Sequence, residues 1–152
     1  MKIQFSVSHL CYVLSISILF SLFQSNDLEA VRTFGKFDNV KVCRVHDGDT
    51  FIADIDGVHP IIGSEISIRI AKIDTPEITD TRNEIKQLAI QARDYVSAKL
   101  AHAKIIQLDN IKRDKYFRIL ADVFVDGESL AEELIAQGLA KPYNGKKKPE
   151  WP

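Results

Sequence analysis

The chain has 152 residues, of which 45% are hydrophobic and 27% are charged. This length suits one domain with a real apolar core and argues against a second domain. Because 20 Lys and Arg residues stand against 21 Asp and Glu residues, bulk positive charge is excluded as a source of affinity for polyanions, which would need a local cluster of cations or a bound metal ion.

The first thirty residues differ in composition from the rest. Lys2 is their only Lys or Arg residue, and residues 10–23, LCYVLSISILFSLF, carry no charge. This run is shorter than the ~20 residues that a membrane-spanning helix needs. The pattern therefore indicates a signal peptide over residues 1–30, cleaved near Ser25 or Ala30, and a secreted or periplasmic domain over residues 31–152. The alternatives are an uncleaved membrane anchor or a buried N-terminal helix.

The cysteines indicate neither a disulfide bond nor a catalytic thiol in the domain. Cys11 lies in the predicted signal peptide, which leaves Cys43 alone in the domain, so no intramolecular disulfide can form there. Because Cys43 lies in the alternating run VKVCRV, we interpret it as a small core residue.

Three strands are predicted in the first half of the domain. Residues 40–45 and 50–55 alternate between apolar and polar side chains, and the Asp47-Gly48 pair between them is a hairpin signal. A third run covers residues 66–73, ISIRIAKI. Three consecutive strands of this kind are expected to form an antiparallel meander.

From Thr81 the apolar spacing changes to three and four residues, which predicts an amphipathic helix. Thr81 and Glu84 form a capping box at its start. Apolar segments of strand type follow at residues 104–108 and 120–125, and the polar run DNIKRDKYFR between them is interpreted as a loop.

A short helix is predicted near the C-terminus. Ser129 and Glu132 form a second capping box, and Gly138 ends the helix. The element order predicts the α+β class: a five-stranded barrel of the oligonucleotide- and oligosaccharide-binding (OB) fold, with a helix between strands 3 and 4 and a short C-terminal helix.

Three carboxylates lie next to the predicted strand ends. Asp49 precedes the second strand, and Asp74 and Glu77 follow the third. Since adjacent antiparallel strands run in opposite directions, these side chains are expected at one rim, where they repel one another unless a hard cation such as Ca²⁺ binds them. Each also has a structural alternative: Asp49 as support of the turn, Asp74 as a loop residue and Glu77 as an acid in a first helical turn.

Two arginines are candidates for binding phosphate. Arg69 lies in the third strand and Arg118 at the end of the polar loop. Each also has the alternative of being an exposed or ion-paired side chain. Together with three carboxylates and a metal ion, however, two guanidinium groups favour cleavage of phosphodiesters, because they bind the phosphate while a carboxylate activates water.

The runs VHDGDTF, IRIAKIDTPE, DKYFRILADVFVDG and LIAQGLAKPY together resemble the staphylococcal nuclease (thermonuclease) family in order and spacing. The resemblance covers nearly all of residues 40–143. It implies an exported, monomeric, Ca²⁺-dependent and sugar-nonspecific nuclease that hydrolyses single-stranded or locally opened DNA and RNA to leave 3′-phosphates. The alternative is a noncatalytic nucleic-acid-binding module of the same fold.

The resemblance also implies three groups of site residues. The metal ligands are the carboxylates of Asp49 and Asp74 and the backbone carbonyl of Thr75. The catalytic residues are the general base Glu77 and the phosphate-binding Arg69 and Arg118. The residues that contact the bound nucleotide are Lys115, Tyr116 and Tyr143.

The chain departs from the family at two places. Where the best-known member has a glycine in the polar loop, this chain has Phe117, which we interpret as packing against the barrel; the alternative is a stacking surface for bases. The chain also stops after KPYNGKKKPEWP, too soon for that member's long third helix. We interpret its three lysines as a solvated tail, with contact to the nucleic-acid backbone as the alternative.

Overall fold

The computed structural model describes residues 33–151, so the predicted signal peptide lies outside the described residues. None of the helices in this part of the chain is both long enough and apolar enough to cross a membrane. The elements are, in chain order, β1 (Val40–Val45), β2 (Thr50–Ile55), α2 (Pro60–Gly63), β3 (Ile66–Ile70), β4 (Ile73–Asp74), α3 (Asn83–His102), β5 (Ile106–Arg113), β6 (Ile119–Val125), β7 (Glu128–Ser129), α4 (Leu130–Ala136) and β8 (Lys141–Pro142).

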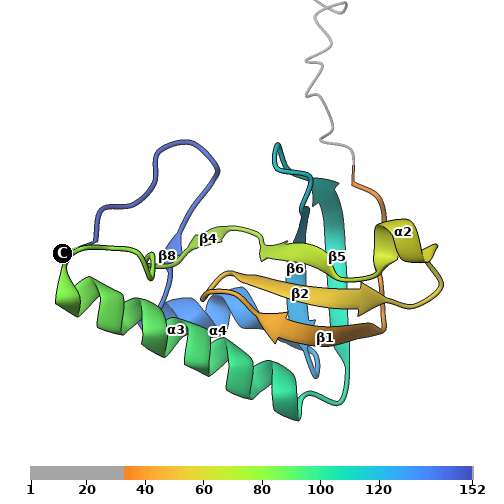
Figure 1. Cartoon of the computed structure of the whole chain (residues 1–152), viewed down its shortest axis with the longest axis horizontal. Coiled ribbons are helices and arrows are strands. Elements are labelled where there is room, and N and C mark those ends of the chain that lie inside the picture. Colours follow the sequence, from red (N-terminus) through yellow and green to blue (C-terminus); the bar gives the residue numbers. More distant parts are fainter. Residues whose placement is uncertain (1–32, 152) are drawn as a thin grey trace, which may run out of the picture. The chain divides into compact units, whose positions relative to one another are not determined.

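One curled sheet of six strands forms the body of the domain (Figure 1). Its order is β1-β2-β3-β6-β5, with β7 paired to β6. The first three strands form the predicted antiparallel meander, whereas β3 and β6 pair in parallel. A curled sheet with α3 between its third and fourth large strands agrees with the predicted α+β architecture.

The core is formed by side chains of the sheet together with those of α3 and α4. Along α3 the buried residues recur at the predicted three- and four-residue spacing: Ile85, Ala89, Ala92, Val96 and Leu100. The strands contribute fully buried side chains, among them Phe51, Ile68, Ile70, Leu108 and Val123. Burial of each such large side chain stabilises the fold by about 1.5–3 kcal/mol, so this core fixes the strand ends that carry the polar site.

Two β-bulges change the expected alternation. In β1 the register shifts between Val42 and Arg44, and Cys43 lies on the surface. Our interpretation of Cys43 as a core residue is therefore wrong. In β5 a second shift between residues 109 and 112 lets the strand continue to Arg113. The predicted polar loop is thus too long, because its first half is strand.

The start of α3 also differs from the prediction. The helix begins at Asn83, its N-cap is Arg82, and no side chain caps it. Instead, the Asp80 carboxylate accepts a hydrogen bond of 2.9 Å from the backbone N–H of Arg82. This Asx-type turn extends the loop by two residues, so the capping box of Thr81 and Glu84 is wrong.

The short C-terminal helix α4 follows its sequence signals. Ser129 is the N-cap, and its hydroxyl accepts a hydrogen bond from the backbone N–H of Glu132. Gly138 follows the helix with a φ of 70°, the left-handed conformation that glycine adopts without a steric cost.

The third predicted strand is divided into β3 and β4. Lys72 lies between them with a φ of 68°, which turns the chain so that β4 leaves the main sheet and pairs with β8 instead. In that pairing Asp74 lies opposite Lys141. The C-terminal segment is therefore attached directly to the strand that carries a predicted metal ligand.

Candidate active site

The hairpin between β1 and β2 brings Asp49 to the edge of the core. Gly48 lies against α3 and against the residue that follows β4: a Cβ atom placed on it would be 2.7 Å from the Cβ of Ala92 and 3.0 Å from the Cγ2 of Thr75. Since real Cβ atoms do not approach so closely, glycine is needed for this turn to come near Thr75. The close approach places Asp49 beside the segment that follows β3.

The Asp49 side chain is buried, and both of its carboxylate oxygens have polar partners. The residue is 4% exposed, and its carboxylate accepts hydrogen bonds from the Thr50 hydroxyl at 2.9 Å and the Thr75 backbone N–H at 3.3 Å. It also forms an ion pair with Arg69. Asp47, which sequence reasoning missed, accepts the backbone N–H of Asp49 at 3.0 Å, and burial together with the charge of Asp49 raises the pKa of Asp47.

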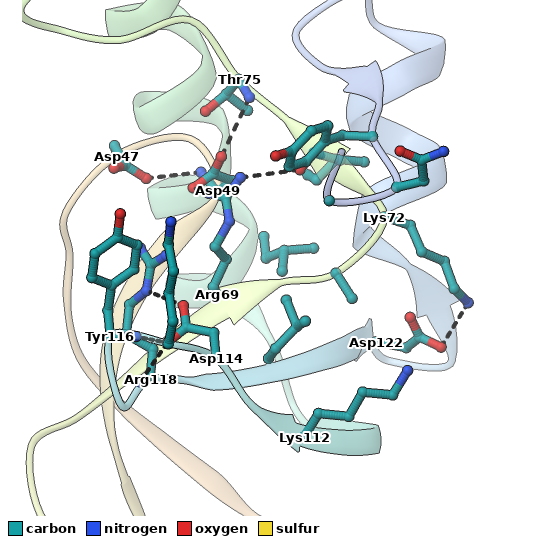
Figure 2. A pocket seen from close by; sticks show the side chains of 18 of the residues that line it. Asp47, Asp49, Arg69, Lys72, Thr75, Lys112, Asp114, Tyr116, Arg118 and Asp122 are labelled. Carbon is teal, nitrogen blue, oxygen red and sulfur yellow. Dashed lines mark hydrogen bonds and ion pairs between the residues drawn. The ribbon is translucent and has the colours of Figure 1, made fainter. Parts of the chain in front are cut away.

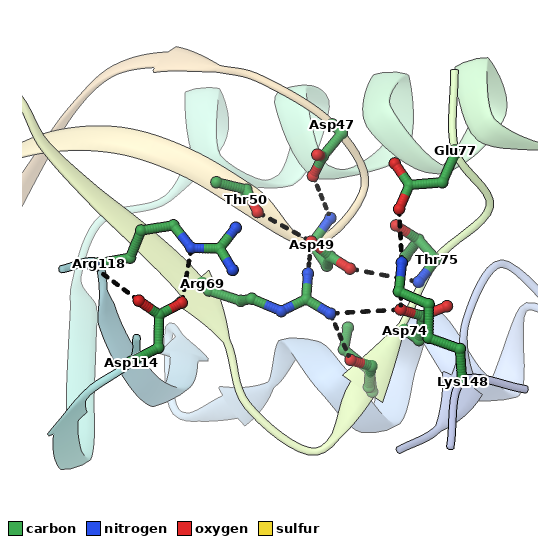
Figure 3. Close-up of polar contacts among 11 residues, drawn as sticks. Asp47, Asp49, Thr50, Arg69, Asp74, Thr75, Glu77, Asp114, Arg118 and Lys148 are labelled. Carbon is green, nitrogen blue, oxygen red and sulfur yellow. Dashed lines mark hydrogen bonds and ion pairs between the residues drawn. The ribbon is translucent and has the colours of Figure 1, made fainter. Parts of the chain in front are cut away.

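Arg69 joins the two buried aspartates. In β3 the neighbouring Ile68 and Ile70 point into the core, so Arg69 points to the other face. Its guanidinium group contacts Asp49 and also donates to Asp74 at 3.4 Å. Burial alone would lower the pKa of Arg69, but the charges of Asp49 and Asp74 outweigh burial and raise it. The group is therefore a permanent cation between two carboxylates (Figure 3).

A second cation comes from the C-terminal segment. The ammonium nitrogen of Lys148 lies 2.6 Å from the Oε1 atom of Glu77 and 3.4 Å from the Oδ1 atom of Asp74. The hydrogen bond to Glu77 raises the pKa of Lys148 above its ordinary value. Our interpretation of all three lysines as a solvated tail is wrong for Lys148, and the expected repulsion among the carboxylates is offset by Arg69 and Lys148.

The loop between β5 and β6 is organised by Asp114, which sequence reasoning also missed. Its carboxylate accepts the backbone N–H groups of Tyr116 at 2.8 Å and Arg118 at 2.9 Å, and the side-chain Nε of Arg118 at 2.7 Å. An aspartate two residues before Tyr116 is the available sequence signal for such a turn. The bonds hold the Arg118 side chain so that it points toward Asp49 and Arg69 (Figure 3).

Phe117 does not pack against the barrel, so that interpretation is wrong. It is 69% exposed, its φ is 65°, and the guanidinium group of Arg113 lies 4.2 Å from its ring centroid. A positive φ is rare for a bulky residue. The turn around Asp114 imposes it, and the same conformation directs the ring outward.

A cavity of about 810 Å³ connects these groups (Figure 2). Of the residues that the resemblance assigns to the site, those that line the cavity are Asp49, Arg69, Thr75, Glu77, Lys115, Tyr116, Arg118 and Tyr143. Asp74 is buried, does not line the cavity and contacts Arg69. Sequence reasoning missed the other end of the cavity, where Lys72 pairs with Asp122 at 2.8 Å and Lys112 lies nearby.

The atoms that the resemblance assigns to a metal ion are all oxygens, the kind of donor that a hard cation binds. Asp49, Asp74 and the carbonyl of Thr75 offer only oxygen, which suits Ca²⁺ better than Zn²⁺. Within residues 33–151, no group of three or more His, Cys, Asp or Glu side chains has the arrangement of a metal site. The partners of the Asp49 and Asp74 carboxylates in this structure are the side chains of Arg69 and Lys148.

The chain is similar in sequence to a known family and to several curated proteins. The model of the family described as staphylococcal nuclease homologue matches residues 67–151. Similar curated proteins include a thermonuclease of Staphylococcus hyicus, 33% identical over 102 residues (66% of this chain and 57% of that protein). A thermonuclease of Staphylococcus intermedius is 28% identical over 134 residues (85% and 76%). The endonuclease YncB of Bacillus subtilis is 35% identical over 109 residues (70% and 48%). The matched regions thus span from about half to three quarters of these relatives.

Proposed function

Because this chain belongs to the staphylococcal nuclease family, we propose that it is a metal-dependent nuclease that hydrolyses phosphodiester bonds. The relatives named above are thermonucleases and an endonuclease, and the family match confirms the resemblance found in the sequence. The observation that carries the proposal is the convergence of Asp49, Arg69, Arg118 and Glu77 at one cavity, with buried Asp74 in contact with Arg69.

We propose Ca²⁺ as the metal ion, held by Asp49, Asp74 and the carbonyl oxygen of Thr75. When bound there, the ion would neutralise charge on a phosphate oxygen of the substrate. Support for this choice comes from the all-oxygen donor set and from the burial of both aspartates.

The residues of the chain supply the rest of the reaction. Glu77 accepts a proton from a water molecule whose oxygen attacks phosphorus in line with the 5′ oxygen of the next nucleotide. The new P–O bond forms as the bond to the 5′ oxygen breaks, the leaving oxygen takes up a proton, and the product carries a 3′-phosphate. Arg69 and Arg118 donate hydrogen bonds to the phosphate oxygens as negative charge develops.

The substrate that we propose is single-stranded or locally opened DNA and RNA. Tyr116 and Tyr143 line the cavity, and their rings can stack only on bases that have left a duplex. Lys115 lies at the same place and carries a charge for the terminal phosphate.

The test is to incubate the protein with labelled single-stranded DNA and RNA in Ca²⁺ or in chelator, and to identify the product ends by mass spectrometry. We expect cleavage in Ca²⁺, fragments with 3′-phosphates, and no cleavage in chelator. Binding of either nucleic acid in Ca²⁺ without cleavage would instead support the noncatalytic binding module.

We further propose that the protein is exported. The support is the uncharged apolar run at residues 10–23. Protein recovered from outside the cytoplasm should begin near Asn26 or Val31 by N-terminal sequencing. A membrane-bound product that retains Met1 would support the anchor in place of the signal peptide.

A further inference from the structure

The C-terminal segment returns to the acidic end of the cavity. Strand β8 pairs with β4, so that Lys141 lies opposite Asp74. From there the chain turns back at Gly145, whose φ is 84°, and passes over the site again. Figure 3 shows Lys148 between Asp74 and Glu77.

Contacts at the end of the segment hold it in this place. The ammonium group of Lys141 donates to the carbonyl oxygen of Glu150 at 2.6 Å and lies 4.7 Å from the ring centroid of Trp151. The guanidinium group of Arg82 donates to the carbonyl oxygen of Trp151 at 2.8 Å. Lys148 is thus enclosed between two fixed points, β8 on one side and Trp151 on the other.

Lys148 contacts one carboxylate of the proposed metal site, Asp74, and the proposed base, Glu77. Its nitrogen shares the Oδ1 atom of Asp74 with Arg69 and is hydrogen-bonded to Glu77. Asp74 is 2% exposed, so Lys148 reaches a buried oxygen that few cations can approach. The Lys148 side chain itself remains 55% exposed, and a lysine has a flexible four-carbon stem, so it can swing into solvent without unfolding the segment.

We propose that Lys148 is an internal cation that competes with the divalent ion for Asp74, and so sets the ion concentration at which the site fills. This inference rests on the proposed function, because it concerns the same site. An ammonium group and a metal ion at the same carboxylate repel each other, because both are positively charged. By linkage, each therefore weakens the binding of the other by the same factor.

The test measures Ca²⁺ binding to the full chain by isothermal titration calorimetry, without nucleic acid. Lys148→Gln should bind Ca²⁺ more tightly than the parent, by about fivefold or more. Lys147→Gln is the matched control, because it removes the same charge from the next residue, whose partner is Glu150 at the exposed surface. It should bind Ca²⁺ like the parent, and Lys148→Arg, which keeps the charge, should not bind more tightly.

Three results would overturn the proposal, and they are distinguishable. If the parent binds Ca²⁺ and Lys148→Gln binds it equally or more weakly, Lys148 is not a competitor, while the proposed metal-dependent reaction stands. An equal gain in Lys147→Gln and Lys148→Gln would also reject it, because the effect would then be general to the charge of the tail. If no variant binds Ca²⁺, the competition and the proposed Ca²⁺ cofactor both fail.

Discussion

Strand β3 is half buried and yet carries a permanent cation, Arg69, because two buried aspartates lie next to it. The register of β2 and β3 places Arg69 opposite Thr50, directly beside Asp49. Two buried aspartates would destabilise the fold if they were left unpaired, because removal of one partner from a buried ion pair costs about 3–5 kcal/mol. Arg69 therefore compensates the carboxylates in the free protein, and in the proposed reaction it also donates hydrogen bonds to the phosphate of the substrate.

At this site we expect Arg69→Lys to lower turnover by roughly a hundredfold or more, because lysine keeps the charge but loses the planar group with several donors. The free energy of unfolding, from urea denaturation in chelator, should fall as well, because one ammonium group cannot bridge Asp49 and Asp74 as Arg69 does. Arg93→Lys is the matched control, since Arg93 pairs with Asp94 on the exposed side of α3. Unchanged turnover in Arg69→Lys would remove Arg69 from the reaction.

The pKa of Asp114 predicts how the stability of the fold changes at low pH. Burial acts to raise this pKa, but the hydrogen bonds from Arg118 and Tyr116 outweigh burial and lower it. A lowered pKa in the folded state means that Asp114 stabilises the fold above its ordinary pKa of about 4. This contribution is lost as the pH falls through the lowered value.

We therefore expect Asp114→Asn to be less stable than the parent at pH 7, and the difference to shrink as the pH falls below about 4. Urea denaturation of both proteins across this range measures it. A difference that stays constant from pH 7 to pH 3, or that grows in acid, would show that the charge of Asp114 does not stabilise the loop.

At the scale of elements, the loop between β5 and β6 separates two neighbouring aromatic residues. Tyr116 lines the cavity, whereas Phe117 lies outside it and stacks with Arg113. Stacking of a base on an aromatic side chain contributes about 1–3 kcal/mol. Tyr116→Ala should therefore weaken the binding of single-stranded DNA, measured by fluorescence anisotropy, by roughly fivefold to a hundredfold.

Phe117→Ala should change the affinity much less, which makes it the matched control within the same loop. A larger loss of affinity in Phe117→Ala than in Tyr116→Ala would mean that bases stack on the outer surface of the loop. In that case the alternative interpretation of Phe117, as a stacking surface, would be correct.

The elements were predictable wherever local pattern alone decided them. The β1–β2 hairpin, the apolar face of α3 and the cap of α4 at Ser129 all follow from short-range signals. Bulges were not predictable, because one extra residue reverses the alternation beyond it. This is why Cys43 was assigned to the wrong face and why β5 was predicted to end too early.

At the scale of the whole molecule, the meander topology made part of the site predictable. Adjacent antiparallel strands must bring Asp49 near Asp74, and the structure places both beside Arg69. Contacts between segments far apart in sequence had no local signal. Lys148 lies 71 residues from Glu77, and only the pairing of β8 with β4 brings them together.

The near-zero net charge of the chain means that any attraction for nucleic acid must come from the charges that line the cavity. The sequence has nearly equal numbers of cationic and anionic residues, so nucleic acid is not attracted by net charge. The cavity instead combines an acidic end, where Asp49 and Glu77 lie with Arg69, and an end with Lys72 and Lys112. Substrate affinity is therefore expected to depend on a few local cations.

The central claim is that this cavity cleaves phosphodiester bonds with Glu77 as the base. The most direct measurement compares single-turnover cleavage of a labelled single-stranded oligonucleotide in Ca²⁺ by the parent, Glu77→Gln and Glu84→Gln. Both glutamates are exposed, and Glu84 lies in the first turn of α3. We predict rapid cleavage by the parent and by Glu84→Gln, and a rate lower by about 10²–10⁴-fold for Glu77→Gln. Equal rates for the parent and Glu77→Gln, or no cleavage by the parent, would contradict the account.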